Sequence, residues 1–259
     1  MAAVSLAPEV ITTVGGFKIT NSIIATFLVD VVLVSLVFII RTHLKLIPGK
    51  LQTIAEGAVF YFYDTTEQIA GKYTQSIFPW FASFFLFIFF SNILGLLPGF
   101  GSIGFFTREH GERVFIPLLR AGTSDFNLTF ALAVVSLVVT HYLAIKYNGI
   151  WEYLKKFFSL NPIFLFVGIL EIVSEFTKIV SLSFRLFGNI YAGEVVIHTI
   201  NSLFAFVAPI PFLLLESIVA LVQALVFSML TMVFMTILIT PHTEASGPGG
   251  PPALRGGEH

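Results

Sequence analysis

The stretch LEIVSEFTKIVSLSFRLFGNIYAGE (residues 170–194) places an arginine, Arg185, in the middle of an apolar run. An arginine at the centre of a membrane-spanning helix costs from about 3 to more than 10 kcal/mol, and its guanidinium keeps its proton. Arg185 is therefore a permanent positive charge rather than a proton carrier. Such a charge suits a carboxylate that arrives and leaves, because a nearby cation favours the ionised form. A static ion pair inside a helix bundle is the alternative interpretation.

The whole chain has the composition of a polytopic membrane protein. Of its 259 residues, 56% are hydrophobic and 11% are charged, whereas soluble domains hold about 25% charged residues. The net charge of -1 gives no indication of nucleic-acid binding. The sequence has no cysteine and no phosphate-binding loop of the G-x-x-x-x-G-K-[ST] type. These absences exclude a thiolate metal site, a thiol nucleophile and nucleotide chemistry at such a loop, and we expect no metal site and no cofactor.

Five apolar segments are long enough to cross a membrane, for which a helix needs about 20 residues. They cover residues 22–40, 77–98, 126–145, 163–200 and 211–240. The sequence predicts an all-α polytopic membrane protein with about five transmembrane helices. Between the first two segments, apolar residues recur at helical spacing from Leu51 to Phe62. This spacing predicts an amphipathic helix that lies on the membrane surface.

The last two segments are unusually long. As single helices they would measure about 57 and 45 Å, against a hydrocarbon core of about 30 Å. Helices of this length must tilt, kink or lie along the membrane plane. A turn near Phe206–Pro211 would make them an antiparallel hairpin. We predict one membrane domain over 1–259, divided into an outer tail (1–20), peripheral helices (22–145), the hairpin (163–240) and a flexible cytoplasmic tail (241–259).

Basic residues predict the orientation of the chain. Seven lie in the loops that follow the first and third apolar segments: Arg41, Lys45, Lys50, Lys72, Lys146, Lys155 and Lys156. Four lie on the opposite side: Lys18, Arg108, Arg113 and Arg120. Because cytoplasmic loops carry the basic excess, we expect the N-terminus outside and the C-terminus in the cytoplasm.

Helical geometry relates the polar residues of the hairpin. Glu194 is nine residues from Arg185, about 180° round a helix, so the two face opposite directions. Arg185 and Gln223 have a sequence midpoint of 204, and Glu194 and Glu216 one of 205, so each pair is expected at a similar depth. Gln223 could hold Arg185 through its amide oxygen. The two glutamates could share protons in a wet pocket or accept hydrogen bonds elsewhere, and His198 could extend a relay or be a structural hydrogen-bonding group.

Other polar residues have simpler interpretations. Glu171 and Glu175 lie near the start of the fourth segment, where a water-exposed helix end explains them as well as a function does. Lys178 is expected to form a packed ion pair with one of them. Asp125 precedes an apolar run, which favours helix capping. Gly188, three residues after the arginine, would allow another helix to approach closely or serve ordinary packing.

Several stretches resemble the subunit a family of F-type ATP synthases. They are LEIVSEFTKIVSLSFRLFGNIYAGE (170–194), LVQALVFSMLTMVFM (221–235), SNILGLLPGF (91–100) and TSDFNLTFALA (123–133). The resemblance spans roughly residues 20–240. It implies a steeply tilted hairpin against a rotating ring of c subunits, with ATP chemistry on another subunit. The implied partners are the c-ring proteolipids, a peripheral stalk of subunit b or a b-like chain, lipid and protons, in a bacterial plasma membrane.

The resemblance also implies roles for individual residues. Arg185 would be the essential arginine between two offset aqueous half-channels. Together with the helical geometry, the resemblance predicts ion-translocating residues Arg185, Asn189, Glu194, Glu216 and Gln223, and half-channel residues Asn92, Glu171, Ser181 and His198. Two positions depart from the family pattern: Glu216 stands where some bacterial members carry histidine, and Gly95 where some relatives have aspartate.

Two other functions fit parts of the sequence. A secondary ion-coupled transporter also places charged residues on midplane helices, but such proteins usually show internal repeats and discontinuous helices, which we do not find. A non-conducting assembly subunit with structural ion pairs is the third possibility. It predicts that Arg185→Lys is nearly harmless, whereas the rotary-motor function predicts loss of coupling.

Overall fold

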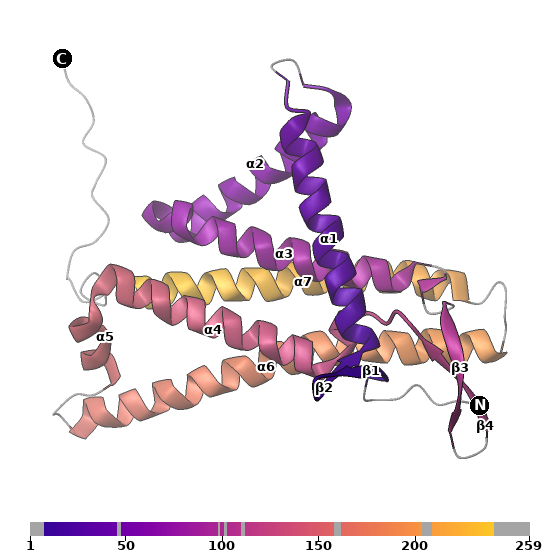
Figure 1. The fold of residues 1–259 in the computed structure, drawn as a ribbon. Coiled ribbons are helices and arrows are strands. Elements are labelled where there is room, and N and C mark those ends of the chain that lie inside the picture. Colours follow the sequence, from indigo (N-terminus) through magenta and orange to yellow (C-terminus); the bar gives the residue numbers. More distant parts are fainter. Residues whose placement is uncertain are drawn as a thin grey trace.

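The structure is a computed structural model and describes residues 8–45, 48–97, 99–100, 103–109, 112–157, 162–203 and 209–240. Helices make up most of these residues (Figure 1). The α-helices are α1 (Asn21–Thr42), α2 (Lys50–Ala70), α3 (Thr74–Leu96), α4 (Phe126–Asn148), α5 (Ile150–Phe157), α6 (Pro162–Leu203) and α7 (Pro209–Ile239). Short 3-10 turns, η1 (Gly71–Tyr73) and η3 (Gly122–Ser124), precede α3 and α4.

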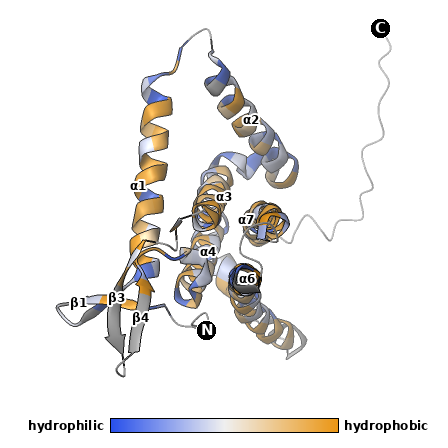
Figure 2. Cartoon of the chain, turned by 90° about the vertical axis from the view of Figure 1, so that its right-hand side faces the viewer, coloured by the Kyte–Doolittle hydropathy of each residue, from blue (hydrophilic) through white to orange (hydrophobic). Residues whose placement is uncertain are grey.

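The helices have the length and composition of membrane spans. Within the described residues, four stretches are long and apolar enough to cross a membrane: Asn21–Thr42, Gln52–Leu96, Phe126–Asn148 and Pro209–Ile239. The prediction of a helical polytopic membrane protein is therefore confirmed. The helix α6 is not among the four, because charged and polar residues interrupt its apolar sequence. Figure 2 shows α1 as apolar over most of its surface, and few of its side chains are buried.

Two β-hairpins lie in segments for which we predicted no strands. One consists of β1 (Val10–Val14) and β2 (Phe17–Thr20), and the other of β3 (Gly104–Glu109) and β4 (Glu112–Pro117). The first hairpin turns through Gly15 and Gly16, both with positive φ. A two-residue turn with positive φ matches the twist of the flanking strands and favours glycine. The Gly-Gly pair in VITTVGGFKIT was therefore the available sequence signal for this hairpin.

The core lies between α3, α4, α6 and α7. The helix α3 packs along α7, and α4 packs along both α6 and α7. Apolar side chains of α3 and α7 fill the centre: Ile77, Phe81, Phe84, Phe85, Ile88, Phe227, Met232 and Met235. The helix α1 is attached mainly at its N-terminal end, where the Ser22 hydroxyl donates to Asp125 Oδ2 at 2.7 Å. This bond ties α1 to the start of α4.

The long helices cross α1 at a steep angle. At 1.5 Å per residue, α1 measures about 33 Å, α6 about 63 Å and α7 about 46 Å. Figure 1 shows α6 and α7 running side by side in opposite directions, and in Figure 2 both are seen largely end-on while α1 stands upright. A 33 Å helix matches the membrane core, so helices that cross it steeply lie obliquely. Most of the predicted turn at Phe206–Pro211, the tail 241–259 and residues 1–7 lie outside the described residues.

Candidate functional site

A polar cavity separates α6 and α7 near the end where the two helices are joined. It has a volume of about 380 Å³, and liquid water takes about 30 Å³ per molecule, so several waters fit. Its lining comes from α3, α6, α7 and the segment before α4. The polar residues among that lining are Asn92, Arg120, Glu194, His198, Asn201 and Glu216. The cavity brings together four of the predicted site residues from three helices.

Arg120 binds Glu194 within this cavity. The Arg120 side chain is only 7% exposed, and its Nε lies 3.3 Å from Glu194 Oε1. Its Nη2 donates to Glu194 Oε2 at 3.3 Å, and its Nε also donates to the Ser124 hydroxyl at 3.1 Å. A buried charge is tolerated when it is paired and hydrogen-bonded. The negative charge of Glu194 is thus compensated by an arginine 74 residues away in the sequence.

Glu216 faces the same cavity from α7 but, unlike Glu194, has a carboxylate oxygen without a hydrogen-bond partner in the described chain. It is 8% exposed, and its Oε1 is buried without a hydrogen-bond partner among the described residues. A Cβ atom added at Gly193 would overlap the Glu216 carboxyl group, so glycine at this position makes room for that group. Buried polar atoms almost always have a protein or water partner. The unpartnered oxygen therefore marks a place for water or a proton.

Arg185 lies on another side of α6. Its side chain is exposed, and its Nη2 donates to the Ser181 hydroxyl at 3.3 Å. Within the described part of the chain it forms no ion pair, so the static ion pair considered above is absent there. Arg185 and Gln223 line one small cavity between α6 and α7, otherwise formed by apolar side chains. The sequence neighbours of Arg185 and Gln223 include the exposed apolar residues Phe184 and Val222.

A family model described as ATP synthase A chain matches residues 23–236, most of the chain. The chain belongs to the ATP synthase subunit a family. ATP synthase subunit a 1 of Hahella chejuensis is 31% identical over 232 residues, which cover 90% of this chain and 89% of the relative. The subunit a of Trichlorobacter lovleyi is 32% identical over 219 residues (83% and 85%), and that of Legionella pneumophila is 29% identical over 231 residues (89% and 91%).

The predicted family is thereby confirmed. Members of the subunit a family are the non-catalytic component of the F-type membrane sector. Membership supports a role in ATP synthesis and proton transport. The apolar helices agree with a multi-pass membrane location.

The remaining predicted residues of this subunit a occupy varied positions. Asn189 is exposed one helical turn beyond Arg185, and His198 is exposed beside the cavity. Asn92 is 2% exposed, accepts from the Thr123 hydroxyl and donates to the Ala220 carbonyl. Glu171 is half-buried near the cytoplasmic end predicted for α6.

Two simpler predictions about polar residues are confirmed. Lys178 Nζ lies 2.7 Å from Glu175 Oε1, as expected for a packed ion pair. The carboxylate of Asp125 accepts from the Asn127 backbone N–H at 2.9 Å and so caps α4. At Gly188, in contrast, an added Cβ atom would meet nothing within 4 Å, so no helix of the described chain approaches this glycine closely.

Two functional candidates escaped the sequence reasoning: Arg120 and Gly193. We used Arg120 only as a loop charge for orientation, because its segment PLLRAGTSD carries no helical periodicity. Its burial depends on the fold of residues 117–125 against α6, which the sequence pattern does not specify. The signal for Gly193 was its position beside Glu194 on a polar side of the helix, since a small residue there allows a second helix to approach closely.

Proposed function

We propose that this chain carries protons through two offset half-channels to and from the carboxylates of a c-ring, and so couples proton flow to rotation and ATP synthesis. The observation that carries the proposal is Arg185: a permanent charge, exposed on an apolar helix surface and without an ion-pair partner in the described chain. Such a charge is costly in lipid. A carboxylate from a neighbouring ring would compensate that charge transiently.

The cavity between α6 and α7 supports an outer half-channel. Its volume admits water, and it holds the unpartnered carboxylate oxygen of Glu216. Water in the cavity would deliver a proton to Glu216 and from there toward the ring. The Arg120–Glu194 pair would add a charge-compensated polar group to the wall of the cavity. Asn92 and His198 contribute further polar side chains to this lining, and Gly95 lies closely against Ala121 there.

Arg185 would separate the outer half-channel from the cytoplasmic one. Beside it, Asn189 and Gln223 supply polar groups, and Glu171 and Ser181 would lie toward the cytoplasmic half-channel. Moving one charge through 100 mV is worth about 2.3 kcal/mol, so several protons per turn would supply the energy for rotation. The partners would be the c-ring, a b-type peripheral stalk and the lipid of a bacterial plasma membrane, with the N-terminus outside and the C-terminus in the cytoplasm.

Proton flux in inverted vesicles that contain the complete ATP synthase tests this function. We expect Arg185→Ala to lower ATP-driven acidification by about a hundredfold or more, as loss of a preorganised charge does. Passive proton uptake under an imposed potential should be retained or raised, because the barrier between the half-channels is gone. Arg185→Lys should also lose coupling, since lysine has a compact head group and can lose its proton.

The matched control is Arg41→Ala, which removes an exposed arginine at the end of α1. This variant should pump like the wild type. Normal pumping by Arg185→Ala, in vesicles with a normal content of the complex, would reduce Arg185 to a structural charge and refute the proposal.

A further inference from the structure

A second group of titratable side chains lies far from the cavity that holds Glu194 and Glu216, which we call the outer cavity. It joins Glu175 and Lys178 of α6 to His141 of α4 and Tyr153 of α5. Glu175 precedes Glu194 by 19 residues, or about 28 Å along a helix. It therefore lies on the other side of Arg185 from the outer cavity. The function proposed above uses neither His141 nor Tyr153.

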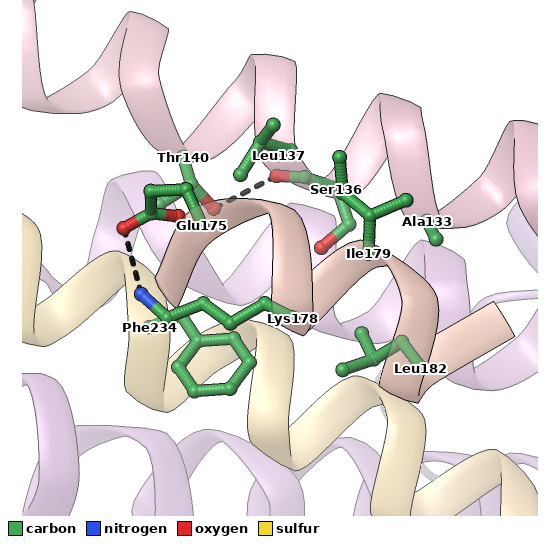
Figure 3. A pocket seen from close by; sticks show the side chains of 9 residues that line it. All are labelled: Ala133, Ser136, Leu137, Thr140, Glu175, Lys178, Ile179, Leu182 and Phe234. Carbon is green, nitrogen blue, oxygen red and sulfur yellow. Dashed lines mark hydrogen bonds and ion pairs between the residues drawn. The ribbon is translucent and has the colours of Figure 1, made fainter. Parts of the chain in front are cut away.

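The Glu175 carboxylate has one occupied and one open oxygen. Glu175 is 6% exposed, and its Oε1 accepts from Lys178 Nζ at 2.7 Å. Figure 3 shows this pair, with the lysine above the ring of Phe234 at 4.7 Å from its centroid. The Oε2 atom is buried, has no hydrogen-bond partner among the described residues, and lies 3.9 Å from His141 Nε2. The lysine is thus engaged, and the open oxygen faces an imidazole.

Tyr153 determines which nitrogen of His141 carries the hydrogen. The Tyr153 hydroxyl lies 2.8 Å from His141 Nδ1. Burial, and then the charges of Glu175 and Glu171, raise the pKa of the Tyr153 hydroxyl above its usual value, so the phenol keeps its proton and can donate it. We therefore assign the hydrogen of the neutral imidazole to Nε2, the nitrogen that faces Glu175.

Two cavities meet at this group. A cavity of about 320 Å³ is lined by His141, Tyr153 and Glu175 together with apolar side chains of α4, α5 and α6. A second cavity of about 10 Å³, drawn in Figure 3, is lined by Ser136, Thr140, Glu175 and Lys178. The smaller volume is close to what one water needs. Glu175 contributes to both cavities and so connects the larger space with the hydroxyl groups between α4, α6 and α7.

We propose that the His141–Glu175 pair is a proton-accepting site on the cytoplasmic side of Arg185, and that Tyr153 is its positioning residue. A proton from the larger cavity adds to Nδ1 of His141, where the Tyr153 oxygen then accepts the hydrogen bond. The imidazolium gives up its Nε2 proton to Oε2 of Glu175, directly after a small rotation or through one water. Exchange with water in the larger cavity then moves the remaining proton from Nδ1 back to Nε2. Glu175 passes the proton toward Ser181 and Arg185, six and ten residues further along α6.

The surrounding charges suit this role. On α6, Lys178 balances the charge of Glu175, and Glu171 is close enough for its charge to act on Tyr153. Among the described residues around the pair, α4 contributes His141, α5 contributes Tyr153 and α7 contributes only the ring of Phe234. The pair with its lysine is therefore neutral, and one extra proton gives a single positive charge that Glu171 partly offsets. This inference rests on the proposed function, because it assigns the cytoplasmic half-channel of the same path.

The test is ATP-driven acidification of inverted vesicles, measured as a function of the pH outside, where the cytoplasmic surface lies. We expect His141→Gln and Glu175→Gln to lower the rate about tenfold at alkaline pH, where proton supply limits uptake. The loss should shrink at acidic pH. The pH at which the rate falls to half its maximum on the alkaline side should therefore decrease by roughly one unit. Tyr153→Phe should move the profile in the same direction by less. His43→Gln, which changes an exposed histidine at the end of α1, is the control.

A structural role would lower the rate by the same factor at every pH. That result, or an unchanged profile, in complexes with a normal content of this chain would overturn the inference. Arg185→Ala is measured in parallel to separate the two proposals. Normal pumping by that variant refutes the half-channel function itself, whereas lost pumping beside unchanged His141→Gln and Glu175→Gln profiles refutes only the proton-accepting site. If Glu175→Gln lowers assembly, the His141→Gln and Tyr153→Phe profiles decide.

Discussion

The two sides of α6 differ in whether this chain supplies a partner for the charge they carry. On the side of the outer cavity, Glu194 is bound by the buried Arg120. On the other side, Arg185 is exposed, and among the described residues its guanidinium donates to the Ser181 hydroxyl of the same helix at 3.3 Å but has no ion-pair partner. A paired charge is compensated within the fold, whereas an unpaired charge on an apolar surface needs an opposite charge from another molecule. The described chain itself supplies the partner on the first side (the scaffold side), and we propose that the second side (the interface side) is an interface with another subunit.

Two glycines of α6, Gly193 and Gly188, also differ in whether the described chain packs against them. Substituting each of them is the strongest test of the difference between the two sides of the helix. Gly193 lies against the Glu216 carboxyl group, whereas the surroundings of Gly188 are open within 4 Å in the described chain. The carboxyl group is the end of a flexible side chain, so Gly193→Ala should displace it rather than unfold the hairpin. A displacement of about 1 Å can cost up to a hundredfold in rate. We expect a loss of about tenfold in ATP-driven pumping.

Gly188→Ala is the matched variant for this prediction. If its position faces only the c-ring, one methyl group should change pumping less than the same group at Gly193, and the amount of complex should stay constant for both. Equal losses in the two variants would mean that the two sides of α6 do not differ in the way described above.

The sequence predicted positions along the helices better than contacts made by loops. The midpoints at 204 and 205 placed Arg185 opposite Gln223 and Glu194 opposite Glu216, and each pair lines a common cavity. Helical periodicity and antiparallel register are sufficient for that result. The partner of Glu194 was missed, because Arg120 reaches it from a loop segment whose path depends on tertiary contacts.

The β-hairpins were missed for a related reason. Strands of four to six residues carry few periods of alternation, and those at residues 104–117 contain charges that we assigned to a loop. Long apolar helices gave clear signals by length alone. The fold class and the position of the charged helix could therefore be predicted, whereas the wall of the outer cavity could not.

A double-mutant cycle sharpens the comparison on the scaffold side. Glu194 is 33% exposed, so solvent screens part of its attraction to Arg120. We expect Arg120→Gln to lower pumping about fivefold, or about 1 kcal/mol. Glu194→Gln removes the charge that Arg120 compensates, so the double variant should lose less than the product of the two single losses. Pumping rates of the four proteins measure this coupling.

Independent effects in that cycle would mean that Arg120 acts only by holding residues 117–125 in place. The Ser124→Ala variant distinguishes this case, because it removes the hydrogen bond from Arg120 Nε to the Ser124 hydroxyl and leaves the ion pair. A loss equal to that of Arg120→Gln would assign the effect to the loop.

The smallest effect is expected at Ser181, on the interface side. Its hydroxyl accepts from Arg185 at 3.3 Å, near the long end of hydrogen bonds. Because the contact is long and exposed, we take the low end of hydrogen-bond contributions, about 0.5 kcal/mol. If Arg185 is held mainly by a carboxylate from outside this chain, Ser181→Ala should lower pumping by less than about threefold. Thr177→Ala is the control, because its hydroxyl donates to its own helix backbone one turn earlier. A tenfold loss specific to Ser181→Ala would mean that this chain itself holds Arg185 in place. The two sides of α6 would then differ in how exposed their charges are, and not in whether this chain supplies a partner.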